Sequence, residues 1–424
     1  MRREDRIDPP LAFACVAMVA YGLWLRMVDL NFPRGMSWDE HHFVLNARSY
    51  LAGVPDLNDH PPLGKLIIAA AIELLGDGSV AWRIAPLLFG CANIALVGLL
   101  ARWATGERRA FYVGAALAAL DGFLIAYSRS ALLDGMLACL CLATVWTAVR
   151  VRTALGIALA SLLLGSACAI KYSAVVFFPI LAWAALSLPR PALALPALLL
   201  APPTYVGWFS LGLHLARQRT GVAAVIAETQ RLYRHHAGLT DWKHPYLSHW
   251  YEWFLPTRPI PMRADPWSEG RVRVLNSIGN PLLWWLVDLA VLVTIAAACV
   301  ALVLAFRKRE LPALLGRLRR IGDTPVKRVL LLAAFAAPLL PWLIAKRDSY
   351  MNHYLPAYVF GIVLVATLFD AALRRFRTAA FVALLVVGQV AFFYSPIWGQ
   401  LPLTRSGVYA RLFVQSWRVQ PGTP

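Results

Sequence analysis

Two adjacent carboxylates stand in an early polar segment of the chain, Ser37-Trp38-Asp39-Glu40-His41-His42-Phe43. Ser37 and Glu40 have the S-x-x-E spacing of a capping box, which predicts that a helix begins here. Glu40 then either binds a backbone N–H of the first turn or belongs to an active site, and the sequence leaves both open. Asp39 would lie in the first turn, where the helix dipole favours an ionised carboxylate. We predict an active-site role for Asp39, with a first-turn acid that only suits the dipole as the alternative.

A second group of ionisable residues follows in Asp59-His60-Pro61-Pro62-Leu63-Gly64-Lys65. Proline suits the first turn of a helix, and the apolar run 63–75 predicts a helix that ends at Gly76-Asp77-Gly78. About thirteen residues cannot cross a bilayer core of roughly 30 Å, so we expect this helix to lie in the membrane interface. A purely structural loop would not need so many ionisable groups. The segment is therefore expected to gather Asp39, Glu40, Asp59, His60 and Lys65 beside the lipid headgroups.

Cationic residues at the ends of apolar runs form a third group. Arg129 precedes one such run, and Lys171 interrupts another. Charges in membrane segments are costly and indicate function by default. The alternatives are snorkelling or a pair with Asp134 for Arg129, and a turn between helices for Lys171. We predict that these two residues form a cationic pocket for a phosphate at membrane depth, together with a later cluster that contains Lys346, Arg347, His353 and Tyr354.

The composition indicates that a membrane surrounds the elements that position these residues. Hydrophobic residues make up 59% of the 424-residue chain and charged residues 15%, whereas soluble domains average roughly half and a quarter. The net charge of +18 would suit a nucleic-acid partner. However, Lys and Arg fall mostly in short clusters between apolar runs, which is how charge sets membrane topology. We therefore expect membrane lipids as partners and no nucleic acid.

Neither the cysteines nor the histidines predict a metal site. The six cysteines lie in apolar runs without a C-x-x-C pair, so we expect small buried hydrophobes. Four histidines in the second polar segment lack a fixed ligand spacing: His235, His236, His244 and His249. The Asp39-Glu40 pair could bind a divalent cation, but no cofactor is required.

Apolar runs of roughly 17–25 residues can cross a bilayer. Nine such runs lie at about 11–30, 81–101, 110–128, 131–149, 191–213, 281–305, 328–345, 354–372 and 377–395. The stretch 153–188 breaks near Lys171 into two more, which gives about eleven spans. The first span follows a charged N-terminus without a cleavage site, so we expect it to be retained. The basic clusters then fall in alternate loops, which the positive-inside rule makes cytoplasmic.

The predicted spans and the loops between them also predict the domain organisation. Residues 1–213 form an N-terminal transmembrane module with a catalytic first outer loop at 31–80, residues 214–280 an outer loop, and residues 281–424 a C-terminal transmembrane module. The fold class is thus an all-α polytopic membrane protein with interfacial helices in the first outer loop. Aromatic residues of the 214–280 loop form either an interfacial belt or a sugar or acceptor contact: Trp242, Trp250, Tyr251, Trp253 and Trp267.

Six ordered segments over about 320 residues resemble the protein O-mannosyltransferases, membrane glycosyltransferases of the GT-C class that use lipid-phosphate-linked mannose. They are Asp39 to Phe43, Asp59 to Lys65, Arg129 with Leu132-Leu133-Asp134, Gly165 to Lys171, Gly279-Asn280-Pro281-Leu282-Leu283-Trp284-Trp285, and His353-Tyr354-Leu355-Pro356-Ala357. The second outer loop, at about 65 residues, is too short for the extra carbohydrate-binding-like domain of eukaryotic members. The chain therefore looks like a bacterial-type member.

The resemblance implies a GT-C fold and a role for each matched position. Asp39, beside Glu40, corresponds to the base that deprotonates the acceptor hydroxyl, and Arg129 to the arginine that holds the lipid phosphate. We extend phosphate contact to Lys171, Arg347 and His353. Substrate binding is assigned to Asp59, His60, Lys65, Asn280 and Tyr354.

This chemistry fits the residue types. A phosphate departs as an anion and needs positive charge already in place, whereas the acceptor hydroxyl needs a base. We therefore predict an inverting mannosyltransferase of the EC 2.4.1 type. It would move mannose from a polyprenyl-phosphate carrier to protein Ser/Thr hydroxyls, at the extracytoplasmic face of the cell (inner) membrane. The alternatives are a GT-C transferase with a lipid or glycan acceptor, and a transporter without catalysis, which would need charges at mid-membrane and matched halves.

Overall fold

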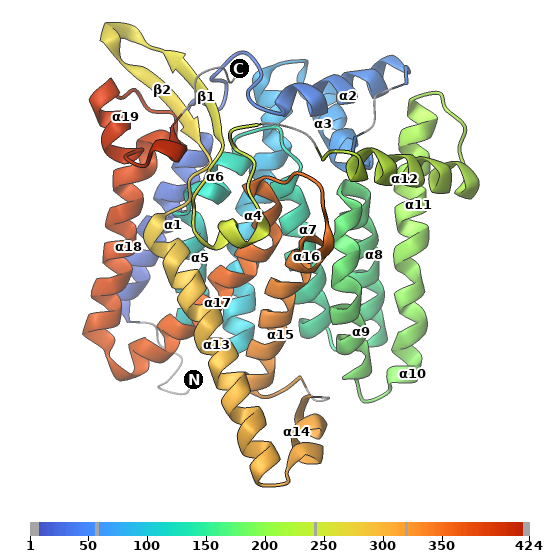
Figure 1. Cartoon of the computed structure of the whole chain (residues 1–424), viewed down its shortest axis with the longest axis vertical. Helices are drawn as coiled ribbons and strands as arrows, with labels where there is room; N and C mark the ends of the chain where they lie inside the picture. Colours follow the sequence, from blue (N-terminus) through green and yellow to red (C-terminus); the bar gives the residue numbers. More distant parts are fainter. Residues whose placement is uncertain (1–7, 56–58, 241–243, 319–320, 419–424) are drawn as a thin grey trace.

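A computed structural model describes residues 8–55, 59–240, 244–318 and 321–418 of the chain. Long helices run side by side through most of it (Figure 1), so the predicted all-α polytopic class is confirmed. The first half contains α1 (Pro9–Met27), α4 (Ser79–Thr105), α5 (Arg108–Ala119), α6 (Gly122–Ser128), α7 (Asp134–Arg150), α8 (Ala154–Ile170), α9 (Phe178–Leu186), α10 (Pro191–Ala194) and α11 (Ala201–Leu215). The second half contains α13 (Pro281–Arg307), α14 (Leu311–Leu318), α15 (Thr324–Ala336), α16 (Leu340–Ile344), α17 (Leu355–Arg375), α18 (Arg377–Trp398) and α19 (Arg405–Arg411).

Within the described residues, seven helical segments are long and apolar enough to cross a membrane. Helices α5 and α6, which meet at a bend of 66°, add an eighth if they count as one span. The chain is therefore an integral membrane protein. Three shorter helical stretches, α7, α8 and Tyr172–Leu186, lie where the sequence predicts the remaining spans.

Helix α17 lies at the centre of the bundle and is the most buried of the candidate spans. It packs against α4, α5 and α7 from the first half of the chain and against α13 and α15 from the second. The two predicted transmembrane modules thus share one core. Because α17 begins at Leu355, this packing brings the residues just before it next to the first outer loop.

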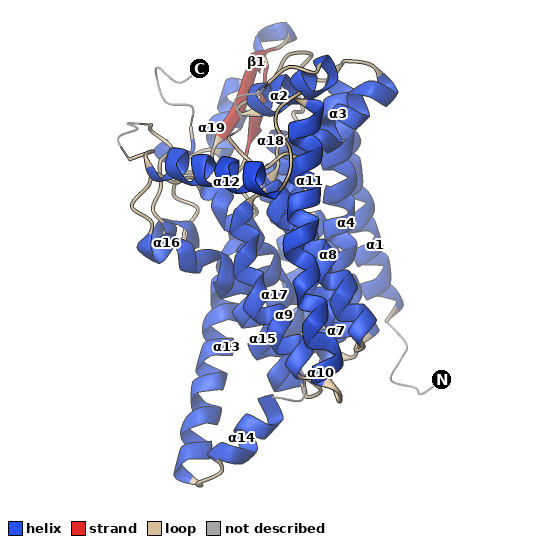
Figure 2. Cartoon of the chain, turned by 90° about the vertical axis from the view of Figure 1, so that its right-hand side faces the viewer, coloured by secondary structure: helices blue, strands red, loops and turns tan. Residues whose placement is uncertain are grey.

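The loops that the sequence predicts to be outer form a layer of short elements at one end of the bundle (Figure 1, top). The first outer loop contains α2 (Glu40–Ala52) and α3 (Leu63–Leu75), and the second contains α12 (Val222–Ala237). Helix α3 has the predicted bounds and ends at Gly76, whose N–H bonds to Ile72 O. Figure 2 shows α12 lying across the bundle helices, with α13 and α14 protruding at the opposite end.

A two-stranded ribbon in the second outer loop is absent from the sequence-based prediction. Strands β1 (Pro261–Pro266) and β2 (Val272–Asn276) pair in antiparallel fashion, with Ala264 opposite Val274. Val272 also forms a bridge to Leu403 beyond α18. The ribbon therefore ties the second outer loop to the C-terminal segment.

Candidate active site

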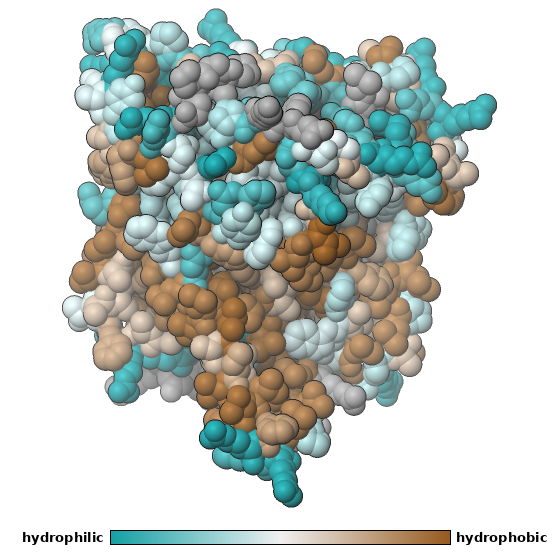
Figure 3. Space-filling view, in the orientation of Figure 1, coloured by the Kyte–Doolittle hydropathy of each residue, from teal (hydrophilic) through white to brown (hydrophobic). Residues whose placement is uncertain are grey.

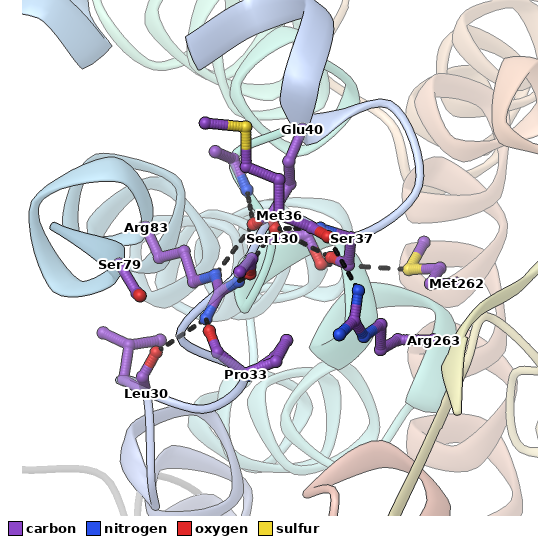
Figure 4. Close-up of polar contacts among 12 residues, drawn as sticks. Leu30, Pro33, Met36, Ser37, Glu40, Ser79, Arg83, Ser130, Met262 and Arg263 are labelled. Atoms are coloured by element: carbon purple, nitrogen blue, oxygen red, sulfur yellow. Dashed lines mark hydrogen bonds and ion pairs between the residues drawn. The ribbon is translucent and has the colours of Figure 1, made fainter. Parts of the chain in front are cut away.

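Glu40 is fully buried and accepts five hydrogen bonds (Figure 4). Arg83 Nε and Nη2 each donate to one carboxylate oxygen over 2.8 Å. The N–H and Oγ of Ser37 donate over 2.7 and 2.8 Å, and the N–H of Ala131 over 2.8 Å. The Ser37 N–H bond is the one that the capping-box spacing predicts. These contacts favour the structural alternative for Glu40.

Arg83 extends the same network into the first outer loop. Its Nη1 donates to the carbonyls of Leu30 and Pro33, over 3.1 and 2.9 Å, and its Nη2 donates to the carbonyl of Gly35 over 3.1 Å. Arg83, on α4, thereby binds Glu40 and also the backbone carbonyls that precede the Asp39-Glu40 pair. The start of α2 is fixed against the bundle as a result.

Asp39 occupies the N-cap position of α2 and makes no capping bond with its side chain. Trp38 before it adopts a left-handed backbone, with φ of 38°, a conformation that is rare for a bulky residue. Burial raises the pKa of the Asp39 carboxyl, against the opposing charges of His42 and Lys171. A carboxylate with a raised pKa is a stronger base at neutral pH.

Lys171 directly follows α8 and forms an ion pair with the first residue of α7. Its Nζ lies 2.8 Å from Asp134 Oδ1, which also accepts a hydrogen bond from Asn352 Nδ2 over 3.2 Å. Lys171 is 8% exposed. Asp134 thus pairs with Lys171 and not with Arg129, the partner that the sequence suggests as an alternative.

A cavity of about 400 Å³ lies beside Lys171. Five residues that the sequence predicts for the site line it: His60, Lys171, Lys346, Arg347 and His353. The apolar side is formed by Tyr172, Tyr233, Pro341, Trp342 and Ile344. The structure thereby brings together residues from the first and second outer loops, from a third predicted outer loop at residues 346–353, and from the end of α8. A cluster of cationic and imidazole groups beside an apolar wall can bind the phosphate of a lipid.

Arg129 does not line this cavity. Its side chain is buried, and Nη1 donates to Leu25 O at the end of α1. The charges that act on it are those of Arg83, Asp29, Arg26 and Arg273. Its contact with a lipid phosphate therefore stays a prediction, without support from the cavity.

The predicted substrate-binding residues other than His60 lie outside the cavity lining. Asp59 Oδ1 lies 3.5 Å from His235 Nε2, and the Lys65 ammonium lies 5.6 Å from the centre of the Tyr50 ring. Asn280 caps α13: its Oδ1 accepts from the N–H groups of residues 282 and 283, and its Nδ2 donates to the carbonyl of residue 387. Tyr354 packs in an aromatic cluster that includes Trp284 and Tyr358.

Two residues of the second outer loop contribute to the cavity walls in a way that the sequence does not predict. The sequence offers Trp253 as a belt, sugar or acceptor aromatic, and His236 as one of four histidines without ligand spacing. Trp253 is fully buried and stacks on His353, with ring centres 6.1 Å apart and planes 20° apart. It thereby supports one wall, whereas Trp242 lies outside the described residues. His236 lines the cavity itself. The only sequence signal for His236 is its position on the apolar face of α12, four residues after the buried Leu232.

His236 joins the first outer loop to Arg347. Its Nε2 lies 2.6 Å from the carbonyl oxygen of Asp59, and its Nδ1 lies 2.8 Å from Arg347 Nη1. Burial lowers the pKa of His236 to about 4, and the Arg347 charge acts in the same direction. The ring is therefore neutral at neutral pH. Among the described residues, no group of three or more His, Cys, Asp or Glu side chains could hold a metal ion.

Two family models match the chain. Residues 59–208 match the model described as dolichyl-phosphate-mannose-protein mannosyltransferase. Residues 223–417 match the model of the C-terminal four-transmembrane region of protein-O-mannosyltransferase. Together these two ranges contain the cavity residues from all three outer loops.

Two curated relatives match this chain over different shares of their length. The polyprenol-phosphate-mannose–protein mannosyltransferase of Mycobacterium tuberculosis H37Rv is 27% identical over 59% of this chain, and the match spans 63% of that protein. The protein of the same name from Mycolicibacterium smegmatis is 24% identical, over 97% of this chain and 94% of that protein.

Solved structures share the fold. The Saccharomyces cerevisiae protein O-mannosyltransferase Pmt1-Pmt2 complex, bound to the sugar donor, superposes with a TM-score of 0.77 at 13% identity. That match covers 98% of this chain and 94% of the solved chain. ArnT from Cupriavidus metallidurans gives a TM-score of 0.59 at 13% identity, over 91% of this chain and 64% of the other.

Proposed function

Because the chain belongs to the protein O-mannosyltransferase family, we propose that it transfers mannose from a polyprenyl-phosphate carrier to hydroxyl groups of proteins. The observation that carries this proposal is the cavity of about 400 Å³ with Lys171, Arg347, His60 and His353 in its lining. Lys171 connects the cavity to Asp39, since its charge also acts on that carboxyl. We therefore propose that the phosphate-binding cations and the base belong to one site.

The proposed reaction is a single displacement. The acceptor hydroxyl loses its proton to the Asp39 carboxylate, and its oxygen forms a bond to the anomeric carbon of mannose. The bond between that carbon and the phosphate oxygen breaks, and polyprenyl phosphate leaves as an anion. Lys171 and Arg347 stabilise the negative charge that develops on the phosphate, so no acid is needed for the leaving group. Attack opposite the leaving group inverts the anomeric configuration.

The apolar flank of the cavity suits the prenyl chain of the donor. Ile344 lines the cavity and is 84% exposed, and Leu340 and Leu343 of the same short helix are also exposed. Figure 3 shows hydrophobic atoms over α16, below and to the left of the hydrophilic atoms of α12. The phosphate would lie between these two zones, as the headgroup of a lipid does in a bilayer.

The proposal includes a topology. We assign eleven spans, made of the eight strongest candidates together with α7, α8 and Tyr172–Leu186. The basic residues around α14 then lie in the cytoplasm, and α2, α3, α12 and the ribbon lie at the extracytoplasmic face of the cell membrane. Lipid-linked donor and translocated protein acceptor meet on that side.

Transfer by the purified protein tests this function. Polyprenyl-phosphate-mannose is supplied with a Ser/Thr-containing peptide, the same peptide with Ala in place of Ser and Thr, and a lipid or glycan acceptor. Mass spectrometry then locates the mannose. We expect it on the Ser/Thr peptide alone. Mannose on the lipid or glycan instead would assign the enzyme to the alternative acceptor class, and no transfer to any acceptor would contradict the proposal.

The Asp39→Asn variant tests the proposed base. We expect the variant to fold normally and to lose about 10²–10⁴-fold in turnover, the usual contribution of a general base. Asp77→Asn is the matched control, because Asp77 lies in the same loop and pairs with Arg48 at the surface. Near-normal turnover by Asp39→Asn would remove the base assignment.

A further inference from the structure

Three consecutive residues between α16 and α17 are bonded to the second outer loop. Arg347 Nη1 bonds to His236 Nδ1 over 2.8 Å, and the Asp348 N–H donates to Leu239 O over 2.8 Å. Ser349 and Ser248 exchange two bonds: the Ser248 N–H donates to Ser349 O over 2.9 Å, and Ser349 Oγ donates to Ser248 O over 2.6 Å. The backbone next to Arg347 is therefore held, and among the described residues of the second loop only His236 is hydrogen-bonded to the guanidinium.

The two partners of His236 fix its tautomer. A guanidinium has only donors, so Nδ1 of His236 must accept the bond from Arg347. The Asp59 carbonyl has only acceptors, so Nε2 must carry the proton and donate. Only a neutral imidazole protonated at Nε2 makes both bonds at once. The ring is 6% exposed and stacks on His60, with centres 5.1 Å and planes 25° apart.

Arg347 has few other contacts that would orient it. Its Nε donates to the neighbouring carbonyl of Asp348 over 3.1 Å, and its guanidinium lies 5.6 Å from the centre of the Trp342 ring. Among the described residues its Nη2 has no hydrogen-bond partner. A long side chain with this freedom would lose rotamer entropy on binding an anion, unless another group already holds it.

We infer that His236 is a positioning residue that holds the Arg347 guanidinium in the cavity, ready to bind the phosphate of the donor lipid. The inference rests on the proposed function, because that function places the phosphate there. His236 has no part in the chemical step. Its effect is on the affinity for the donor and passes through Arg347.

Two substitutions of His236 separate this role from a general structural one. His236→Phe keeps a flat ring but removes both hydrogen bonds. His236→Asn keeps an acceptor at the distance of Nδ1 from the backbone, so it can still bind Arg347, but it cannot reach the Asp59 carbonyl. His235→Gln is the matched control on the neighbouring, exposed position of α12. Each variant is purified as the full chain, and its unfolding temperature is compared with that of the wild type.

The readout is the KM for polyprenyl-phosphate-mannose, measured separately from kcat. We expect His236→Phe to raise the donor KM about tenfold, the scale of one lost hydrogen bond to a charged group, with kcat changed less than twofold. His236→Asn should restore most of the donor affinity. In an Arg347→Ala background, His236→Phe should add nothing further, because the residue through which it acts is gone.

Three results would overturn the inference while leaving the proposed function intact. The first is an active wild type together with a His236→Phe variant whose donor KM is unchanged. The second is a His236→Asn variant that is as impaired as Arg347→Ala. The third is that the effects of His236→Phe and Arg347→Ala on the donor KM add up in the double variant. Should His236→Phe fail to fold, the comparison of His236→Asn with Arg347→Ala still decides the matter. A wild type that transfers no mannose would contradict the proposed function itself.

Discussion

Asp39 and Glu40 are neighbours in sequence with different environments. Glu40 is enclosed by the guanidinium of Arg83 and two backbone N–H groups, whereas the Asp39 side chain makes no bond to its own helix. Because the two residues share a peptide bond, the contacts of Glu40 also fix the backbone of Asp39. For the base that we propose, a fixed backbone reduces the reorganisation needed when the substrate arrives.

Replacing Glu40 by Gln should mainly destabilise the fold. The change leaves the Arg83 charge buried without a counter-ion, which typically costs about 3–5 kcal/mol. Thermal unfolding in detergent measures this effect, and Glu73→Gln, at an exposed position of α3, is the control that should unfold like the wild type. A Glu40→Gln protein with wild-type stability but no activity would return Glu40 to the catalytic group.

At the scale of single residues, the sequence predicts which residue types belong to the site better than it predicts which residues contact one another. The spacing of Ser37 and Glu40 anticipates one hydrogen bond correctly, because a capping box is local. It gives no sign of Arg83, which lies inside a predicted span 43 positions later. The partner of Asp134 is likewise a lysine from the next helix, because the ends of α7 and α8 meet only in the folded bundle.

Among the elements, α8 and α11 pack tightly against each other at Gly165. A Cβ placed on Gly165 would lie 2.4 Å from the backbone oxygen of Ala201 and 2.7 Å from Thr204 Cβ. Backbone atoms cannot move aside as the end of a flexible side chain can. Helix α8 ends at Ile170, directly before Lys171, so its packing on α11 also positions the lysine of the cavity.

Gly165→Ala should therefore lower both stability and donor use. Overpacking of a close contact typically costs about 1–3 kcal/mol, and separation of the two helices would shift Lys171. The control is Gly207→Ala on α11, where an added Cβ meets nothing within 4 Å and alanine is the better helix former. Unfolding temperature and donor KM are measured for both. Equal behaviour of the two variants would contradict the close-packing argument.

Elements with long apolar runs are predictable, and short polar ones are not. The bounds of α3 agree with the sequence because proline and glycine mark its ends. The bend between α5 and α6 falls inside one predicted span, at Asp121, whose side chain caps α6 and also binds Asn280 and Tyr358. The β1–β2 ribbon has only a few alternating residues per strand, so it carries no clear pattern.

Across the whole molecule, the cavity is assembled from segments far apart in sequence. His60, Lys171, His236 and Arg347 come from four parts of the chain, and the central packing of α17 brings the last part to the others. The sequence identifies three of these four residues by type. It cannot show that Arg129 faces α1 instead, because an arginine at the end of a helix can turn in several directions.

The proposed topology can be tested with single cysteines in intact cells. Ser406→Cys, in α19 beyond the last span, should react with a membrane-impermeant maleimide, whereas Ala313→Cys, in α14, should react only after the membrane is permeabilised. Both positions are exposed. The wild-type chain, whose described cysteines are all free, gives the background. The reversed labelling pattern would place the cavity on the cytoplasmic side.

The exposed Ile344 beside the cavity has a consequence for how the enzyme would meet its donor. A substrate that enters past this residue arrives by lateral diffusion within one leaflet, not from bulk water. Turnover would then depend on the number of donor molecules per unit area of bilayer. In detergent, adding empty micelles at constant total donor would slow the reaction, and in the membrane the rate would follow the supply of carrier lipid to the leaflet that the cavity faces.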